Sequence, residues 1–119
     1  MDAKLDVGGG KHVQVVVTHF GNHRDVLDRQ LQTQEVAAVL RRAPESVPYL
    51  FLGYLTNSPY SPHYNMLVDA GWKDSAPHEM RRWCQYIFYR GLVLEAFRRY
   101  DTGDTSDTEA QIGHFRLPK

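Results

Sequence analysis

Hydrophobic and polar positions alternate along this chain in a pattern that predicts an α/β fold. Residues 12–18 are rich in β-branched side chains and predict a strand. From Asn22 to about Arg41 the apolar positions recur at helical spacing, and Asn22 is a suitable N-cap. A second strand is predicted over residues 49–52, ending at Gly53. Because a strand, helix, strand unit forms a right-handed crossover, we expect the two strands to pair in parallel.

The predicted helix is amphipathic, so one side of it should lie on the sheet. The apolar side carries Val26, Leu27, Leu31, Ala37 and Ala38, and the polar side carries Arg24, Asp28, Arg29, Gln32 and Glu35. Arg41 and Arg42 suit the negative carboxyl end of the helix, and Pro44 ends it.

The middle of the chain predicts a loop and a short helix. Residues 56–63 are rich in proline and serine, which is typical of a loop. A helix is expected from about Ser61 to Ala70, with Gly71 ending it.

The last third of the chain predicts three strands. Residues 83–89 and 92–100 are joined tightly at Arg90-Gly91, which indicates a hairpin. A helix is the alternative for residues 92–100, because its apolar positions also fit the helical period. A polar loop at residues 101–107 precedes a last strand at residues 109–117.

The three strands at residues 13–17, 49–52 and 83–89 are apolar at both odd and even positions. Strands buried on both faces show this pattern. Two helices cover one face only, so we expect the other face to meet another sheet, a partner chain or a missing part of the same domain. The alternative is an apolar face left in solvent, which large patches rarely are.

With 119 residues, the chain can form one domain with a real core. We interpret residues 1–11, with three glycines and no periodicity, as a flexible lead-in, and residues 12–119 as a single half-domain. Lys11 after the glycines suggests a phosphate loop, but the spaced glycines and the following Ser or Thr of that motif are absent.

Charge and cysteine content exclude several classes of function. Fourteen basic and fourteen acidic residues cancel, so no overall field attracts a polyanion, and nucleic acid is not expected as a partner. The single cysteine, Cys84, forms no internal disulfide, and we interpret it as a core residue. We find neither a signal peptide nor an apolar run long enough for a membrane span.

Several separate strings over residues 12–118 resemble the C-terminal half of the endonuclease/exonuclease/phosphatase family, the deoxyribonuclease-I-like phosphodiesterases. These strings are Thr18-His19, Leu52-Gly53-Tyr54-Leu55-Thr56, Cys84-Gln85-Tyr86-Ile87 and Ser106-Asp107-Thr108. More specifically, the chain is similar to the C-terminal domain of cell-wall-biogenesis proteins that remodel the lipid of glycosylphosphatidylinositol (GPI) anchors. The strings that carry this resemblance are His19-Phe20-Gly21-Asn22, Leu27-Asp28-Arg29-Gln30-Leu31-Gln32, Phe51-Leu52-Gly53-Tyr54, Arg82-Trp83-Cys84-Gln85-Tyr86-Ile87, Tyr89-Arg90-Gly91-Leu92 and Ser106-Asp107.

The resemblance implies half of a deoxyribonuclease-I-like α/β sandwich, with a mixed sheet and helices on one face. The half that carries the metal-binding Glu and the first catalytic Asn would precede residue 1. The family also implies a divalent metal such as magnesium, endomembrane association, and a GPI or inositol-phosphate lipid as ligand.

The resemblance also implies site residues, several of them replaced. His19 matches the catalytic histidine that contacts the scissile phosphate, and Asp107 matches the aspartate of the family's Ser-Asp-His string. Tyr54 stands in place of the water-activating aspartate, and a phenol, protonated at neutral pH, cannot act as the same base. Thr56, Gln85 and Thr108 replace the family's Asn, Asp and His, so metal ligands and the water-activating pair are missing.

Four further groups are candidates for binding substrate: Asn22, Tyr54, Asn57 and Arg90. Arg90 could bind a phosphate or inositol through its planar fork, with Tyr86 and Tyr89 beside it, although packing is the alternative use of the tyrosines. Asp107 also fits a turn residue that binds local amides. His23 follows His19 at metal-ligand spacing, but His19 precedes the helix, so we interpret the spacing as coincidental.

Two functions follow from these observations. The first is a metal-dependent phosphodiesterase-like domain of GPI-lipid remodelling, catalytically incomplete as this chain. The second is a pseudoenzyme with a structural or assembly role in a larger complex. Nuclease activity is a third, disfavoured by the zero net charge and the lost acidic residues.

Overall fold

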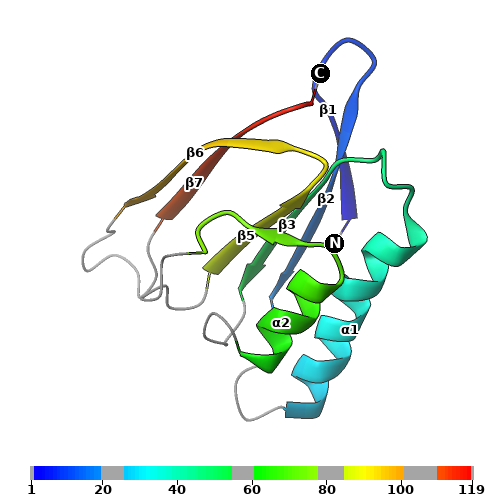
Figure 1. Cartoon of the computed structure of the whole chain (residues 1–119), viewed down its shortest axis with the longest axis vertical. Coiled ribbons are helices and arrows are strands. Elements are labelled where there is room, and N and C mark those ends of the chain that lie inside the picture. Colours follow the sequence, from blue (N-terminus) through cyan, green and yellow to red (C-terminus); the bar gives the residue numbers. More distant parts are fainter. Residues whose placement is uncertain (1, 20–25, 55–60, 78–84, 101–109, 119) are drawn as a thin grey trace.

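The computed structural model describes residues 2–19, 26–54, 61–77, 85–100 and 110–118. The elements in these ranges are β1 (Asp2–Asp6), β2 (His12–His19), α1 (Val26–Arg42), β3 (Tyr49–Tyr54), α2 (Pro62–Asp69), β4 (Lys73–Asp74), β5 (Gln85–Arg90), β6 (Val93–Tyr100) and β7 (Ala110–Arg116). A five-stranded sheet has the order β1-β2-β3-β5-β4, and β6 and β7 form a separate two-stranded sheet. Figure 1 shows α1 and α2 side by side along one side of the larger sheet, with β6–β7 on the other side.

The larger sheet is mixed, as the sequence predicts. β2 and β3 are parallel, whereas β1 is antiparallel to β2, and β5 is antiparallel to both β3 and β4. The fold is therefore an α/β half-sandwich with helices on one face.

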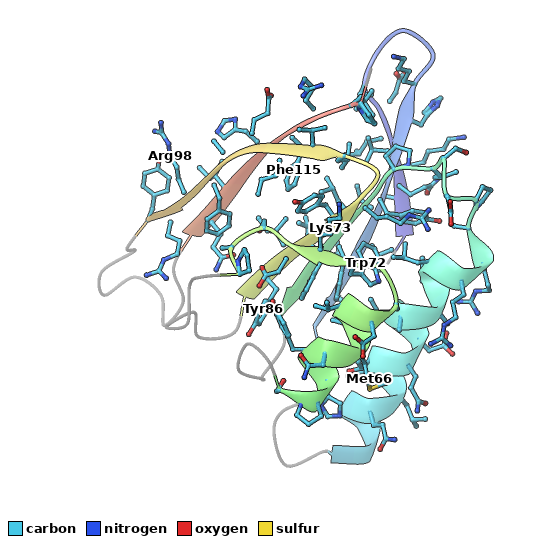
Figure 2. The ribbon with its side chains drawn as sticks, in the orientation of Figure 1. Met66, Trp72, Lys73, Tyr86, Arg98 and Phe115 are labelled. Atoms are coloured by element: carbon cyan, nitrogen blue, oxygen red, sulfur yellow. The ribbon has the colours of Figure 1, made fainter. Side chains whose placement is uncertain are left out.

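The main core lies between the sheet and the two helices. Phe51 and Phe88 from the sheet and Leu67 from α2 are fully buried there, and Trp72 is nearly so. The Trp72 indole Nε1 donates a hydrogen bond to the Val36 carbonyl at 3.1 Å, which ties the end of α2 to α1. In Figure 2, Trp72 and Tyr86 lie between the ribbons of the sheet and the helices. Burying such aromatic side chains contributes roughly 1.5–3 kcal/mol each, so this layer carries much of the fold's stability.

The buried face of α1 differs in part from the prediction. Ala37 is buried as predicted, but Leu31 is 50% exposed, and Thr33, Val36 and Leu40 are buried with Ala37. These four buried positions follow the i, i+3, i+4, i+7 spacing of one helix face. The side chains of Val26 and Leu27, also predicted on this face, lie outside those that the structure describes. Apolar residues are spread widely around α1, so packing against α2 and Trp72, rather than the sequence pattern, selects the side that faces the sheet.

The short helix α2 forms as predicted. The Ser61 hydroxyl accepts a hydrogen bond from the Tyr64 amide at 3.3 Å, and Pro62 occupies the first turn, where its missing N–H costs nothing. Gly71 follows the C-cap Ala70 with φ +113°, a conformation that glycine adopts without strain.

The interpretation of residues 1–11 as a flexible lead-in is wrong for residues 2–6. They form β1, which pairs with β2 so that Leu5 lies opposite Val13. A turn through the three glycines, all with positive φ, joins the two strands, and the Asp6 carboxylate accepts a hydrogen bond from the Gly8 amide at 2.8 Å. The sequence of β1 is too short and polar to signal a strand alone, and the unpaired edge of β2 supplies its hydrogen-bond partners.

The predicted hairpin at Arg90-Gly91 is also wrong, although both of its strands exist. β5 belongs to the larger sheet and β6 pairs with β7, so Gly91 is a corner between two sheets. Gly91 has φ +71°, and a Cβ there would lie 3.2 Å from the Pro48 Cα. A glycine and close backbone approach suit a sharp corner as well as a hairpin turn, which is why the sequence did not distinguish them. The strand β6 excludes the helical alternative for residues 92–100.

Candidate functional site

The ends of three neighbouring strands lie in one row at one end of the larger sheet. β2 ends at His19 and the parallel strand β3 ends at Tyr54, which pairs with it. The antiparallel strand β5 begins at Gln85, which pairs with Tyr54. We name His19, Tyr54 and Gln85 the strand-end row. The backbone therefore brings together three positions that are far apart in the sequence.

The strand-end row offers an imidazole, a phenol and a carboxamide. These groups can hydrogen-bond a phosphate oxygen, and the imidazole can also exchange a proton near neutral pH. None of the three residue types is a carboxylate, the group that most often activates water beside a bound metal. By residue type, the row therefore lacks the group that most often activates water.

The residues of the described ranges do not fit the divalent metal that the family implies. No group of three or more His, Cys, Asp or Glu side chains that could hold a metal ion occurs among them. Magnesium is held mainly through carboxylate oxygens, and the strand-end row contains none. These described residues therefore offer no ligand set for a metal-dependent step.

Several predicted site residues lie outside the described ranges. Asp107, Asn22 and Asn57 are among them, as are Thr56 and Cys84. Of the six candidates, His19 and Tyr54 are placed by their backbone at the strand-end row. Only Arg90 is placed with its side chain.

Arg90 lies at the opposite end of β5 from the strand-end row, because Gln85 begins this strand and Arg90 ends it. Its guanidinium donates hydrogen bonds to the carbonyl oxygens of Leu40 at 3.3 Å, Pro44 at 2.7 Å and Val47 at 2.9 Å. It also lies over the Tyr49 ring at 5.4 Å from the centroid. The sequence suggests that Arg90 binds a phosphate or inositol; in the structure its guanidinium instead secures the connection between α1 and β3.

Tyr86 and Tyr89 serve packing, the alternative that the sequence left open. Tyr86 is buried, with ring centroids 5.8 Å from Tyr64 and 5.5 Å from Phe88. Tyr89 points to the other face and meets Phe115 of β7 at 5.2 Å.

The sequence reasoning missed a buried polar pair beside the sheet. The Tyr64 hydroxyl donates a hydrogen bond to the Asp74 carboxylate at 2.7 Å, and the Ala76 amide donates another at 3.0 Å. Asp74 is buried in β4, the edge strand next to β5. The signal that could have found it is the polar pair Asp74-Ser75, which follows Gly71-Trp72 after one residue, since burial of a charge requires partners.

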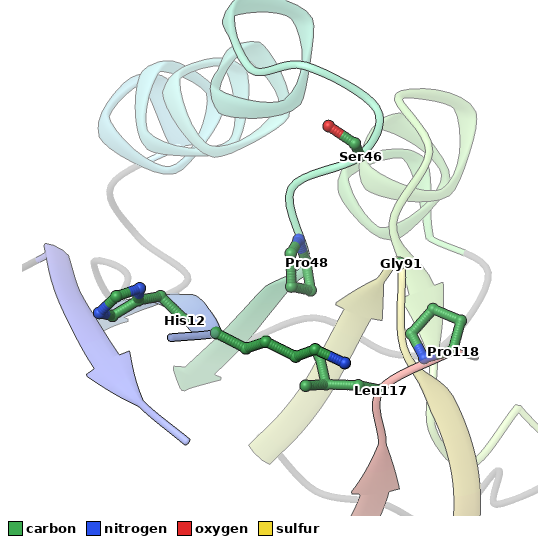
Figure 3. Close-up of a pocket in the computed structure, with 7 residues that line it drawn as sticks. His12, Ser46, Pro48, Gly91, Leu117 and Pro118 are labelled. Carbon is green, nitrogen blue, oxygen red and sulfur yellow. The ribbon is translucent and has the colours of Figure 1, made fainter. Parts of the chain in front are cut away.

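A pocket of about 260 Å³ lies at the end of the sheet opposite the strand-end row. Its lining includes His12, Ser46, Gly91 and Pro118. Figure 3 shows His12 and Ser46 at separate places in the pocket, with Pro48 between them.

Neither of the two described helices is long and apolar enough to cross a bilayer.

Comparisons with known proteins agree with the fold. Residues 1–119 match the sequence model of the family described as "PGAP2IP, C-terminal nuclease-like domain". The chain is 41% identical over 118 residues to "Protein cwh43" of Schizosaccharomyces pombe, a match that covers 98% of this chain and 12% of that protein. The chain thus spans about an eighth of this curated relative.

Solved structures show the same fold at low identity. An endonuclease/exonuclease/phosphatase from Beutenbergia cavernae matches with a TM-score of 0.69 and 21% identity, over 98% of this chain and 38% of that one. Sphingomyelinase C from Streptomyces griseocarneus matches with a TM-score of 0.55 and 18% identity, over 98% of this chain and 53% of that one. The described structure is therefore part of an endonuclease/exonuclease/phosphatase-like fold.

Proposed function

Because the chain belongs to the family of PGAP2IP C-terminal nuclease-like domains, we propose that it forms part of a phosphodiesterase-like domain that acts in remodelling the lipid of GPI anchors. The ligand class is a phosphodiester or inositol-phosphate head group, and the setting is the endomembrane system. As this chain alone, the domain is catalytically incomplete.

One observation carries this proposal, the pairing of His19 with Tyr54 and of Tyr54 with Gln85 at one sheet edge. The family resemblance gives these three positions catalytic roles, and the sheet register places them side by side. This register supports a binding site kept at this end of the sheet, because in an unrelated arrangement of strands the three positions would lie apart.

At this edge, His19 supplies a hydrogen bond or a proton to a phosphate oxygen. Tyr54 and Gln85 supply neutral hydrogen-bond donors in the places where the family resemblance puts carboxylates. Neutral donors favour a bound anion, whereas two carboxylates without a metal would repel it.

The test replaces His19 in the intact protein and measures the lipid composition of GPI anchors in cells that lack the endogenous protein. His19→Ala is expected to reduce lipid remodelling by about tenfold or more, as for loss of a group that contacts the phosphate. His12→Ala is the matched control, because His12 begins the same strand and is exposed at the opposite end of the sheet.

Equal remodelling by the wild type and His19→Ala would contradict a chemical role for His19. Equal loss in both histidine variants, with reduced protein levels, would trace the effect to folding instead. Only a selective loss in His19→Ala supports the proposal.

A pseudoenzyme with a structural or assembly role is the alternative function. The absence of carboxylate residues from the strand-end row favours it. In that case His19→Ala leaves remodelling unchanged, while variants that disturb the fold of this chain, such as Leu67→Ala in the core, reduce it.

A further inference from the structure

A pocket of about 510 Å³ lies beside β4, the edge strand of the larger sheet. Its lining comes from α2, from β4 with the residues before and after it, and from Tyr89 of the neighbouring strand β5. Small-molecule sites occupy about 300–1,000 Å³, so the volume suits a small ligand. We name this pocket the β4 pocket.

The walls of the β4 pocket are largely apolar. Trp72 and Tyr64 line it and are only 1% and 2% exposed, so core packing fixes their positions. The hydrogen bond from the Trp72 indole to the Val36 carbonyl holds the first of these rings in place. Val68 of α2, which is 42% exposed, adds an aliphatic surface. A ring can pack its C–H groups against such a preformed surface.

Two charged side chains of opposite sign line the same pocket. Lys73 is exposed, and its ammonium forms no ion pair within the described ranges. Asp74 is 8% exposed, and its carboxylate accepts hydrogen bonds from the Tyr64 hydroxyl at 2.7 Å and the Ala76 amide at 3.0 Å. Figure 2 shows Lys73 and Trp72 next to each other at the β4 ribbon. The polar part of the lining thus has no net charge.

These two charges decide the class of ligand. An anion in the pocket meets the Asp74 carboxylate and a cation meets the Lys73 ammonium, so each gains one attraction and one repulsion. A neutral hydroxyl group both donates and accepts hydrogen bonds, so it is compatible with either charge. A ring with hydroxyl groups at its edge and C–H groups on its faces therefore matches both the polar and the apolar lining.

We propose that the β4 pocket is a subsite for a neutral sugar ring. The inference rests on the proposed function for the source of this sugar, which is the glycosyl part of the GPI anchor. It does not depend on His19 or on a chemical step at the strand-end row.

The β4 pocket lies a short distance along β5 from the strand-end row. Asp74 pairs with Phe88, which is three residues from Gln85. At about 3.3 Å per residue, this separation along the strand is about 10 Å. One phosphate cannot fill both places, whereas a phosphate and a sugar of one ligand can occupy one place each.

The experiment titrates three probes with the same ring into this chain and follows the amide signals by NMR. D-glucose is neutral, whereas at about pH 6 D-glucosamine is a cation and D-glucuronate is an anion. Glucose is expected to shift the amide signals of residues 64–77 with a Kd on the order of 1 mM. Both charged analogues are expected to bind about threefold more weakly or less, because each meets one like charge.

Lys73→Met tests the pocket itself, because it removes the ammonium from an exposed position and keeps an unbranched side chain. The substitution is expected to weaken glucose binding by about tenfold, as for loss of a charged hydrogen-bond donor. Lys4→Met is the matched control, since Lys4 is an exposed lysine of β1 at the opposite edge of the sheet. It should bind glucose like the wild type, and circular dichroism checks the folding of both variants.

Three results would overturn the inference. The first is no shift of these amide signals with glucose up to roughly 50 mM. The second is equal glucose binding by the wild type and Lys73→Met. The third is tighter binding of either charged analogue than of glucose, which would assign the pocket to a charged ligand.

A last probe, the soluble glycan released from a GPI-anchored protein, tests the source of the sugar. It should bind about tenfold more tightly than glucose, because a larger ligand makes further contacts. Equal affinity would remove the GPI anchor as the source. His19→Ala should bind glucose like the wild type, so failure of the proposed lipid function and failure of this inference are read separately.

Discussion

Tyr64 and Asp74 connect α2 to the edge strand β4 through a buried hydrogen bond of 2.7 Å. A buried carboxylate needs such donors, because a carboxylate that loses a donor no longer has a hydrogen bond to offset the cost of its desolvation. Arg90 plays a similar part for the α1–β3 connection, where its guanidinium reaches the carbonyls of Leu40, Pro44 and Val47. These two sets of hydrogen bonds stabilise the edge strand β4 and the α1–β3 connection.

Tyr64→Phe should lower the free energy of unfolding by about 1–3 kcal/mol, because it removes a donor from the buried Asp74 carboxylate. Urea unfolding followed by circular dichroism measures the change. Tyr100→Phe is the control, since Tyr100 is 45% exposed and the same loss of a hydroxyl there should cost little. Equal effects of the two substitutions would contradict the role given to the Tyr64–Asp74 bond.

Arg90→Lys should also destabilise the chain, by about 1–2 kcal/mol, because an ammonium cannot reproduce the planar fork that reaches three carbonyls. Arg98→Lys, at an exposed position of β6, should be nearly neutral. Binding of inositol phosphate to the intact protein should be the same for Arg90→Lys and the wild type. A selective loss of binding with unchanged stability would restore the phosphate role to Arg90.

At the scale of elements, the corner at Gly91 decides how the chain divides between two sheets. Gly91 combines φ +71° with a close approach to Pro48, and β5 and β6 leave it in different sheets. Gly9, with φ +63°, has open space around the position of a Cβ. A substitution at Gly9 therefore tests backbone strain alone, whereas a substitution at Gly91 tests backbone strain together with a steric contact.

Gly9→Ala should cost about 1–2 kcal/mol, the penalty of a left-handed backbone for a residue with a side chain. Gly91→Ala should cost more, because the same strain is joined by the contact at 3.2 Å with the Pro48 Cα. Thermal unfolding of the two variants gives the comparison. A smaller loss for Gly91→Ala than for Gly9→Ala would contradict the corner described here.

At the scale of the whole molecule, the chain consists of a helix layer, a mixed sheet and a partial second sheet. The helix side is closed by aromatic packing around Phe51, Phe88 and Trp72. Among the described residues, the other side is closed where Tyr89 meets Phe115 and where Val13 and Val15 are buried, whereas Val17 and Leu52 are exposed. Stability should therefore be uneven across the molecule.

Amide hydrogen exchange of the isolated chain should show weaker protection in β6 and β7 than in β3 and β5, because the smaller sheet can open without disrupting the core. Exchange measured residue by residue by NMR tests this. Uniform protection across both sheets would show that β6–β7 unfolds only with the rest of the chain.

The sequence predicted much of the fold because its signals are local. The β-branched run gave β2, the apolar run over residues 49–52 gave β3, and the crossover rule gave the parallel pairing of these two strands. Ser61 and Gly71, at the two ends of α2, gave that helix. β1, the buried side of α1 and the partners of β5 and β6 were not predicted correctly. Each of these depends on contacts between distant segments, such as the pairing of Leu5 with Val13 or the hydrogen bond from Trp72 to the Val36 carbonyl.

By itself, the sequence determined the family resemblance, the strand that ends at His19 and the sheet apolar on both faces, because residue type and period record these directly. Only the tertiary structure decided that His19, Tyr54 and Gln85 lie together at one end of the strands and that Arg90 lies at the opposite end of β5. It also decided that the sheet face away from the helices is buried at Val13 and Val15 but exposed at Val17 and Leu52. Strand register and the crossing of the two sheets fix those facts, and both arise from long-range packing that no local pattern contains.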